Sequence, residues 1–274
     1  MLARQGIRWI MTTAPGFWAR IHFSGCGMHI RRVEAGQGIV WVQTGWAGFM
    51  RLPGLWILLT LVFLAIIVIL SLIPYVGSLI VALIGPVLGA GALEAARRTN
   101  RGENFAIGIL FDAFSRNAVL NDLLVLGAVS LAMNALIMGI GAVCIGSSML
   151  GMGMMHGEGG ALVGVGLGAL IGLPMVLTLH ALLSAGLFFA VPLVMEGRAS
   201  PLTAMQDSLK ACWVNWAALL LFSIVVTILS VLAMISMGLG FLVLGPVLTC
   251  AVWAAYAEIF PAEPALAQLS EPVS

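Results

Sequence analysis

The apolar residues of this chain gather into six long runs, which are separated by short segments rich in glycine, proline and charge. A helix of roughly 20 apolar residues crosses the ~30 Å hydrocarbon core of a bilayer. The pattern therefore predicts six membrane-spanning helices, at about 55–73, 78–96, 119–145, 163–194, 214–235 and 240–257. The fourth run is long enough to contain a kink, because Pro174 and Pro192 lie in it and a proline removes an intrahelical hydrogen bond.

A short amphipathic stretch precedes every second run, on the side from which the chain enters the membrane. Its apolar residues fall on one helical face in each case: Ile39, Val42, Trp46, Phe49 and Met50; Ile107, Leu110, Phe111, Phe114 and Ala118; and Met205, Leu209, Cys212, Trp213 and Trp216. Such stretches, with tryptophans at headgroup depth, are typical of helices that lie in the membrane interface. The expected fold class is an all-α polytopic membrane helix bundle, with six spans in three hairpins that each follow an interfacial helix.

An internal repeat supports this organisation. A shift of 160 residues places Gly85-Pro86-Val87-Leu88 on Gly245-Pro246-Val247-Leu248 and Trp56 on Trp216 without a gap. Spans one and two then coincide with spans five and six. Because two spans separate the matching halves, the repeat is parallel rather than inverted.

The composition excludes a soluble globular domain. Hydrophobic residues make up 61% of the chain and charged residues 8%, whereas soluble domains are about a quarter charged. The basic residues after the N-terminal extension all lie at the same ends of the predicted spans: Arg31, Arg32, Arg51, Arg97, Arg98, Arg101, Arg116, Arg198 and Lys210. The connections on the other side, around 74–77, 147–160 and 236–238, hold no Lys or Arg. The positive-inside rule then predicts a multi-pass protein of the bacterial inner membrane with both termini in the cytoplasm.

Three regions are expected along the chain. Residues 1–30 form an N-terminal extension that lacks the apolar core of a signal peptide, and we expect it to be disordered or translation to begin at Met28 rather than Met1. Residues 31–260 form the six-span membrane domain. Residues 261–274 are expected to be a disordered cytoplasmic tail.

A glycine series opens the fourth span. Gly160, Gly164, Gly168 and Gly172 recur every four residues, so they lie along one face of a helix. A dinucleotide-binding glycine motif would instead lie in a turn between a strand and a helix. The series therefore predicts a helix-packing ridge, and its partner is either another span of this chain or a second copy.

Few side chains inside the spans carry chemistry. The carboxylates Glu94, Asp122, Glu196 and Glu258 lie at span ends, which argues against a carrier coupled to protons or sodium ions. Asn134 and His180 lie within spans three and four as a candidate intramembrane polar site. They either form interhelical hydrogen bonds or, if they face one cavity, line a substrate site.

A methionine-rich segment lies between spans three and four. Met149, Met152, Met154, Met155 and His156 are candidate ligands for a soft cation such as Cu(I), since thioether and imidazole suit it. The same residues also fit a plain flexible linker. The four cysteines are scattered without a CxxC pair, and no HExxH, GxSxG or P-loop motif occurs. We therefore expect neither an enzyme nor a bound cofactor.

Several segments together carry a family resemblance: Arg31-RVEAGQGIVWVQTGW, Leu72-IPYVG, GPVLGAGALEAARR, Ser208-LKACWVNWAALLLF and Tyr256-AEIF. They resemble a proteobacterial family of uncharacterised six-span inner-membrane proteins, over roughly residues 31–260. The plan is also similar to the membrane domain of some glycerophosphoryl diester phosphodiesterases. The resemblance implies a fold plan and a location, and it brings no catalytic residues.

Two hypotheses for the function follow. The first is a non-enzymatic membrane protein that packs with lipids, with a second copy or with another membrane protein, as a scaffold. The alternative is a transport or permeation protein for a small solute or a soft metal. No nucleic-acid partner is expected.

Overall fold

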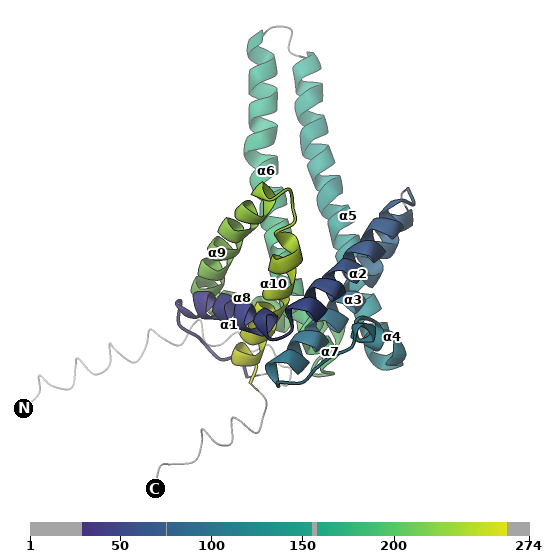
Figure 1. Ribbon diagram of the computed structural model, residues 1–274. Helices are drawn as coiled ribbons and strands as arrows, with labels where there is room; N and C mark the ends of the chain where they lie inside the picture. Colours follow the sequence, from purple (N-terminus) through teal and green to yellow (C-terminus); the bar gives the residue numbers. More distant parts are fainter. Residues whose placement is uncertain (1–28, 75, 155–157, 262–274) are drawn as a thin grey trace, which may run out of the picture.

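The computed structural model describes residues 29–74, 76–154 and 158–261, and helices dominate this part of the chain (Figure 1). The helices are α1 (Gln37–Arg51), α2 (Pro53–Ser71), α3 (Val76–Asn100), the 3₁₀ helix η2 (Ile107–Phe111), α4 (Asp112–Ser115), α5 (Asn117–Met154), α6 (Glu158–Phe188), α7 (Ala190–Met195), α8 (Pro201–Val214), α9 (Trp216–Ile235) and α10 (Phe241–Ile259). Residues 1–28 of the expected extension (1–30) and residues 262–274 of the expected tail (261–274) lie outside the described residues.

Six membrane-length apolar segments confirm the predicted polytopic bundle. They are Pro53–Ser71, Val76–Asn100, Asn117–Cys144, Gly172–Met195, Trp216–Ile235 and Phe241–Ile259. Helices α2 and α3, α5 and α6, and α9 and α10 pack as consecutive pairs, which are the three predicted hairpins. Five of these segments match the sequence prediction to within a few residues. The fourth predicted span, 163–194, corresponds to most of α6 together with α7.

The connection predicted at 147–160 is mostly helical, which corrects that expectation. Helix α5 continues to Met154 and α6 begins at Glu158. Glycine disfavours a helix by only about 1 kcal/mol per residue, and the methionines and leucines between the glycines are good helix formers. At 38 residues, α5 is about 57 Å long and exceeds the thickness of a bilayer. Figure 1 shows that this hairpin extends farther than the other two.

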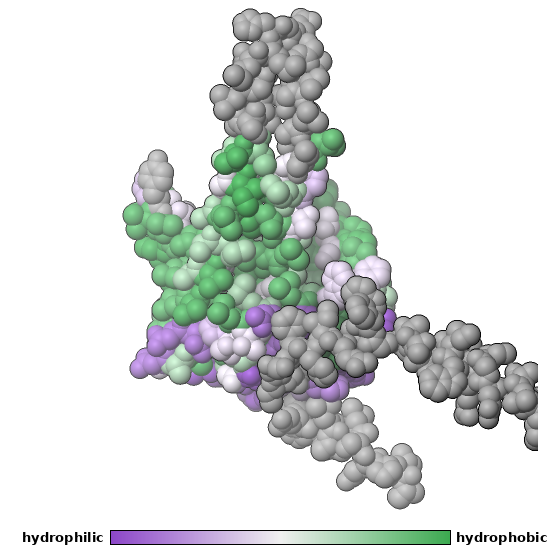
Figure 2. All heavy atoms as spheres, turned by 180° about the vertical axis from the view of Figure 1, so that it is seen from behind, coloured by the Kyte–Doolittle hydropathy of each residue, from purple (hydrophilic) through white to green (hydrophobic). Residues whose placement is uncertain are grey.

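The polar residues collect at one end of the bundle, which we call the polar base. It comprises α1, η2, α4 and α8 together with the span ends that meet them, and Figure 2 shows it as a hydrophilic layer below an apolar band. The first and third predicted interfacial helices are α1 and α8. The second is shorter than predicted, because a 3₁₀ turn and a single α turn replace one amphipathic helix.

Helix α1 lies against α9 and α10 through glycines rather than through its predicted apolar face. A Cβ atom at Gly38 would collide with the backbone of Ala218, and one at Gly45 with the carbonyl of Val247. Phe49 of the predicted face is buried, whereas Ile39, Trp46 and Met50 point outward and are exposed. The face of α1 that packs against α9 and α10 is therefore determined by how closely their backbones approach. The positions of apolar residues in the sequence do not reveal this.

The fourth span is interrupted at Phe189, three residues before Pro192. The ring of a proline disfavours the helical geometry of the preceding turn, so the helix ends and restarts there. Ser208 of α8 fills the gap: its Oγ accepts from the N–H of Phe189 at 2.9 Å and donates to the carbonyl of Ala185 at 2.6 Å. These are the two groups that a continuous helix would pair with each other. One hydroxyl therefore satisfies both ends of the broken hydrogen bond.

Replacing Ser208 with alanine is expected to lower the free energy of unfolding by about 1–3 kcal/mol, because the buried N–H of Phe189 loses its partner and the carbonyl of Ala185 keeps only a weak bond from Cys212. Unfolding of the purified protein in mixed micelles, followed by circular dichroism, measures the change. The matched control is Ser223→Ala, because the exposed Ser223 hydroxyl only bonds the Leu219 carbonyl of its own helix. Equal stability of the two variants would contradict the bridging role.

Candidate functional site

A cavity of about 500 Å³ lies between α2, α3, the α6–α7 junction and α10. Its lining is almost wholly apolar: Trp56, Leu59, Thr60 and Phe63 from α2; Gly85, Pro86, Gly89, Ala92 and Leu93 from α3; Leu110 from η2; Leu187, Phe188 and Val191 at the junction; and Gly245, Pro246, Leu248, Thr249 and Val252 from α10. Its volume falls within the range of roughly 300–1,000 Å³ that is typical of small-molecule sites. Sequence reasoning did not identify this cavity as a site.

The two Gly-Pro pairs of the internal repeat meet at this cavity. Gly85-Pro86 lines it from α3, and Gly245-Pro246 lines it from α10. A Cβ atom placed on Gly85 or on Gly89 would touch no atom within 4 Å. These glycines leave open space instead of admitting a neighbouring helix. The internal repeat was visible in the sequence and pointed to these residues. It did not indicate that its two copies would line the same cavity.

The two tryptophans of the repeat have different surroundings. Trp56 is 1% exposed, lines the cavity and packs against the ring of Phe105 with ring centroids 5.1 Å apart. Trp216 is 63% exposed at the polar base. The cavity is therefore built on one copy of the repeated tryptophan only.

Polar groups in the lining are mostly satisfied within their own helices. The hydroxyl of Thr60 donates to the carbonyl of Trp56 at 2.9 Å, and that of Thr249 donates to the carbonyl of Gly245 at 3.0 Å. The buried indole Nε1 of Trp56 has no hydrogen-bond partner among the described residues. Neighbouring protein atoms cover this nitrogen, so the lining offers an occupant no free hydrogen-bond donor.

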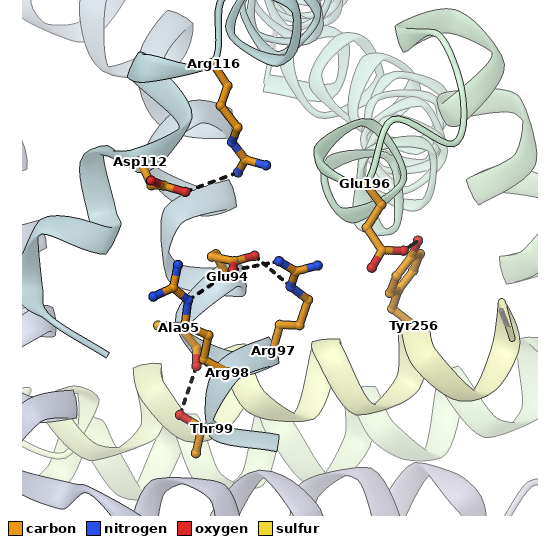
Figure 3. A network of polar contacts seen from close by, with 9 residues as sticks. All are labelled: Glu94, Ala95, Arg97, Arg98, Thr99, Asp112, Arg116, Glu196 and Tyr256. Carbon is orange, nitrogen blue, oxygen red and sulfur yellow. Dashed lines mark hydrogen bonds and ion pairs between the residues drawn. The ribbon is translucent and has the colours of Figure 1, made fainter. Parts of the chain in front are cut away.

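A carboxylate with two guanidinium groups lies just beyond the cavity, at the base end of α3 (Figure 3). Glu94 is 3% exposed. Its Oε1 accepts from Arg97 at 2.8 Å and from Arg98 at 3.2 Å, and its Oε2 lies 2.8 Å from the Nε of Arg97. All three residues belong to α3, and the single carboxylate balances only one of the two guanidinium charges. The negative charge of Glu196, at the end of α7, also acts on Arg97.

A second polar group joins different helices. The hydroxyl of Tyr256 donates to Glu196 Oε2 at 2.7 Å, which connects α10 with the end of α7. Arg198 donates to the carbonyl of Phe260 at 2.8 Å, where the helix α10 has no further turn to pair its carbonyls. Figure 3 shows the side chains of Tyr256 and Glu196 close together, beside the Glu94 cluster.

Side chains at the α8–α9 bend hold the beginning of the described chain. Asn215 accepts from the N–H of Val33 at 2.8 Å and donates to the carbonyl of Arg31 at 3.1 Å. The N–H of Arg31 donates to the carbonyl of Ile259 at 2.9 Å. Both ends of the described chain therefore lie at the polar base, where Asn215 pairs backbone groups of residues 31 and 33.

The predicted intramembrane polar site is not joined by hydrogen bonds in the described part of the chain. The amide of Asn134 is half-buried and donates to the carbonyl of Ser130 in its own helix, at 2.8 Å. The side chain of His180 is exposed on the outer face of α6. Neither residue lines the 500 Å³ cavity.

The glycine ridge can be described at one position. A Cβ atom on Gly172 would lie 2.6 Å from the Cβ of Cys144, so this glycine packs closely against α5 of the same chain. The surroundings of Gly160, Gly164 and Gly168 lie outside the described residues. So do the side chains of Met149, Met152, Met154, Met155 and His156, and the soft-metal hypothesis stays a prediction.

Within the described residues, no group of three or more His, Cys, Asp or Glu side chains is placed to hold a metal ion. Cys212 lies at the polar base and donates weakly to the carbonyl of Ala185 at 3.5 Å. Burial raises the pKa of the Cys212 thiol to about 11. A thiol with this pKa is almost fully protonated near neutral pH and is therefore a poor nucleophile.

The ion pairs at the base differ in their expected contribution to stability. Glu94→Ala is expected to lower the free energy of unfolding by about 1.5–3 kcal/mol, because it removes charge-assisted bonds to a buried carboxylate. Asp112→Ala removes a 3.6 Å pair with Arg116 whose side chains are 41% and 39% exposed, and about 0.2–1 kcal/mol is expected. Unfolding in mixed micelles tests both, and a larger effect at Asp112 would refute this ranking.

Comparisons with known proteins agree with a membrane location. Over 203 residues the chain is 27% identical to a probable inner membrane protein of Burkholderia thailandensis, covering 72% of this chain and 74% of that protein. No protein-family model matches the chain. No solved structure matches it either. The likeness in plan to the phosphodiesterase membrane domain stays a prediction. With its six membrane-length helices, the chain is an integral membrane protein similar to that inner membrane protein.

Proposed function

We propose that this protein is a non-enzymatic scaffold of the bacterial inner membrane, and that it acts through helix packing between two copies along α6. The observation that carries the proposal is the exposed imidazole of His180 inside a membrane-length segment. The polar base faces the cytoplasm in this proposal, with both termini on that side.

The distribution of basic residues supports this orientation. Every Lys and Arg of the described residues lies in the polar base or at a span end beside it, from Arg31 to Lys210. Cytoplasmic segments next to spans carry an excess of such residues. Anionic lipid headgroups on that side of the membrane would add to the attraction.

In a single copy of the chain, the polar side chain of His180 would be exposed to lipid, which is unfavourable. Ionisable and strongly polar side chains inside spans nearly always face protein or a water-filled cavity, because exposure to hydrocarbon costs several kcal/mol. Within the described residues, the imidazole has no hydrogen bond or ion pair, and its position on the outer face is open. A second membrane-embedded helix would cover it.

The neighbours of His180 form a seam suited to such a helix. Leu173, Leu177, His180 and Ser184 are all exposed, and their spacing of four, three and four residues places them in one stripe. A neutral imidazole has one donor and one acceptor nitrogen, so two symmetry-related His180 side chains can bond each other. A two-fold axis along this stripe brings like residues together. The occupant we propose is therefore a second copy of the chain.

The remaining site features favour packing over catalysis or transport. The cavity lining is apolar and supplies neither a nucleophile with a base nor a row of polar groups for a solute. Cys212 has a raised pKa, and the polar groups of the base bond backbone and one another. These observations support a non-enzymatic role.

Cysteine cross-linking in native membranes tests the proposed dimer. Leu177→Cys is expected to give a disulfide-linked dimer on mild oxidation, because Leu177 lies in the seam. Leu182→Cys is the matched control: Leu177 is 59% exposed and Leu182 53%, but Leu182 lies on a different part of the outer face. Equal cross-linking of both, or none from Leu177→Cys, would reject the seam.

The role of the imidazole has its own test. His180→Leu is expected to weaken self-association in nanodiscs by about 3- to 30-fold, which corresponds to the ~0.6–2 kcal/mol of an interhelical hydrogen bond. His180→Gln is expected to keep the dimer, because an amide also donates and accepts. The proportion of dimer by mass photometry is the readout, and loss with both variants would contradict the hydrogen-bond explanation.

A further inference from the structure

The cavity lies among the membrane-length helices, and one end of it reaches the polar base. Trp56 is the fourth residue of α2, close to the base, and Phe63 lies about 10 Å farther along the helix. Pro86 and Pro246 line it from the interiors of two spans. The cavity therefore runs from the level of the lipid headgroups into the hydrocarbon region.

The cavity is a partly open apolar groove that the protein's own side chains leave unfilled. Protein interiors are close-packed and contain few voids larger than a water molecule, because each missing contact forfeits dispersion attraction. The cavity measures about 500 Å³. Half-buried lining residues such as Thr60, Phe63 and Pro86 border it, so an occupant can enter from the bilayer.

Water does not suit the cavity. A buried water needs two to four polar partners, and both threonine hydroxyls of the lining already donate to carbonyls of their own helices. The open sides of Gly85 and Gly89 add no polar side chain to the lining. An apolar, flexible chain satisfies this lining, and membrane lipids supply such chains at the highest concentration around a span.

The end of the cavity nearest the polar base lies at the depth of the membrane interface. Trp56 lies near the beginning of α2, at the level of this interface, and protein atoms cover its indole N–H. Tryptophan is enriched at the membrane interface because its ring is apolar and its N–H is a donor. The ester oxygens of phospholipids are acceptors that lie at this depth.

We propose that the cavity binds one acyl chain of a membrane phospholipid, with the ester end toward Trp56 and the chain end toward Pro86 and Pro246. The protein is thus a lipid-binding protein in which the two copies of the Gly-Pro repeat form one site. This site does not depend on the α6 dimer, because its lining comes from one chain.

Native mass spectrometry of the protein released from nanodiscs tests the proposal. Wild type is expected to retain one phospholipid per chain. Gly89→Leu places a side chain in the cavity where a Cβ meets no atom within 4 Å, and retention is expected to fall at least tenfold. Gly139→Leu is the matched control, since Gly139 is also a span glycine with open surroundings but lies outside the cavity, and its retention is expected to equal that of wild type.

A second measurement keeps the proposal testable if Gly89→Leu does not fold. Phospholipids brominated on the acyl chain quench tryptophan fluorescence at short range, and the difference between wild type and Trp56→Phe isolates the signal of Trp56. Strong quenching of that signal is expected. Absence of quenching, undiminished retention by folded Gly89→Leu, or retention of an isoprenoid in place of a phospholipid would overturn the proposal. The His180→Leu variant, if monomeric, separates this proposal from the proposed dimer. Retention of one phospholipid per chain by that variant would show that lipid binding does not need the dimer.

Discussion

The bilayer requires every backbone N–H and C=O group within it to be paired inside the protein, and the architecture follows from this constraint. Helices satisfy it automatically, so the chain builds its six spans from them. The informative positions are those where a helix is interrupted. At Phe189 the hydrogen bond is broken beside Pro192, and the Ser208 hydroxyl restores pairing on both sides. A serine on a base helix thus permits a bend within a span.

Backbone groups are also paired in the polar base, where the helices end at the membrane surface. Arg51 donates to the carbonyl of Thr99 at 2.7 Å, Arg198 donates to that of Phe260, and Asn215 holds residues 31–33. These side chains pair backbone groups that have no partner within their own helices. The base therefore holds the ends of three hairpins in one layer, and its polar residues are occupied by structural bonds. The apolar cavity lies above this layer, between the spans.

The Gly-Pro repeat connects the architecture with the two proposals. A proline in a span removes one backbone donor, and the adjacent glycine leaves space beside it. Because the copies on α3 and α10 face the same space, their combined effect is a cavity rather than a tight helix contact. Gly38, Gly45 and Gly172 have the opposite role, since another chain segment occupies the place of their missing side chains. Glycine thus permits close helix contacts at some positions and lines the cavity at others.

The sequence by itself determined the six spans, the three hairpins and the collection of charge on one side, because bilayer thickness and the cost of charge in lipid act on each segment separately. It also identified Asn134 and His180 as polar positions within spans. Only the tertiary structure decided that His180 faces outward, that Trp56 is buried while Trp216 is exposed, and that the two Gly-Pro pairs enclose one cavity. Lipid and protein are almost equally apolar surroundings for a helix face, so the sequence pattern carries little information about which face meets which, and that choice depends on shape complementarity between helices far apart in the chain.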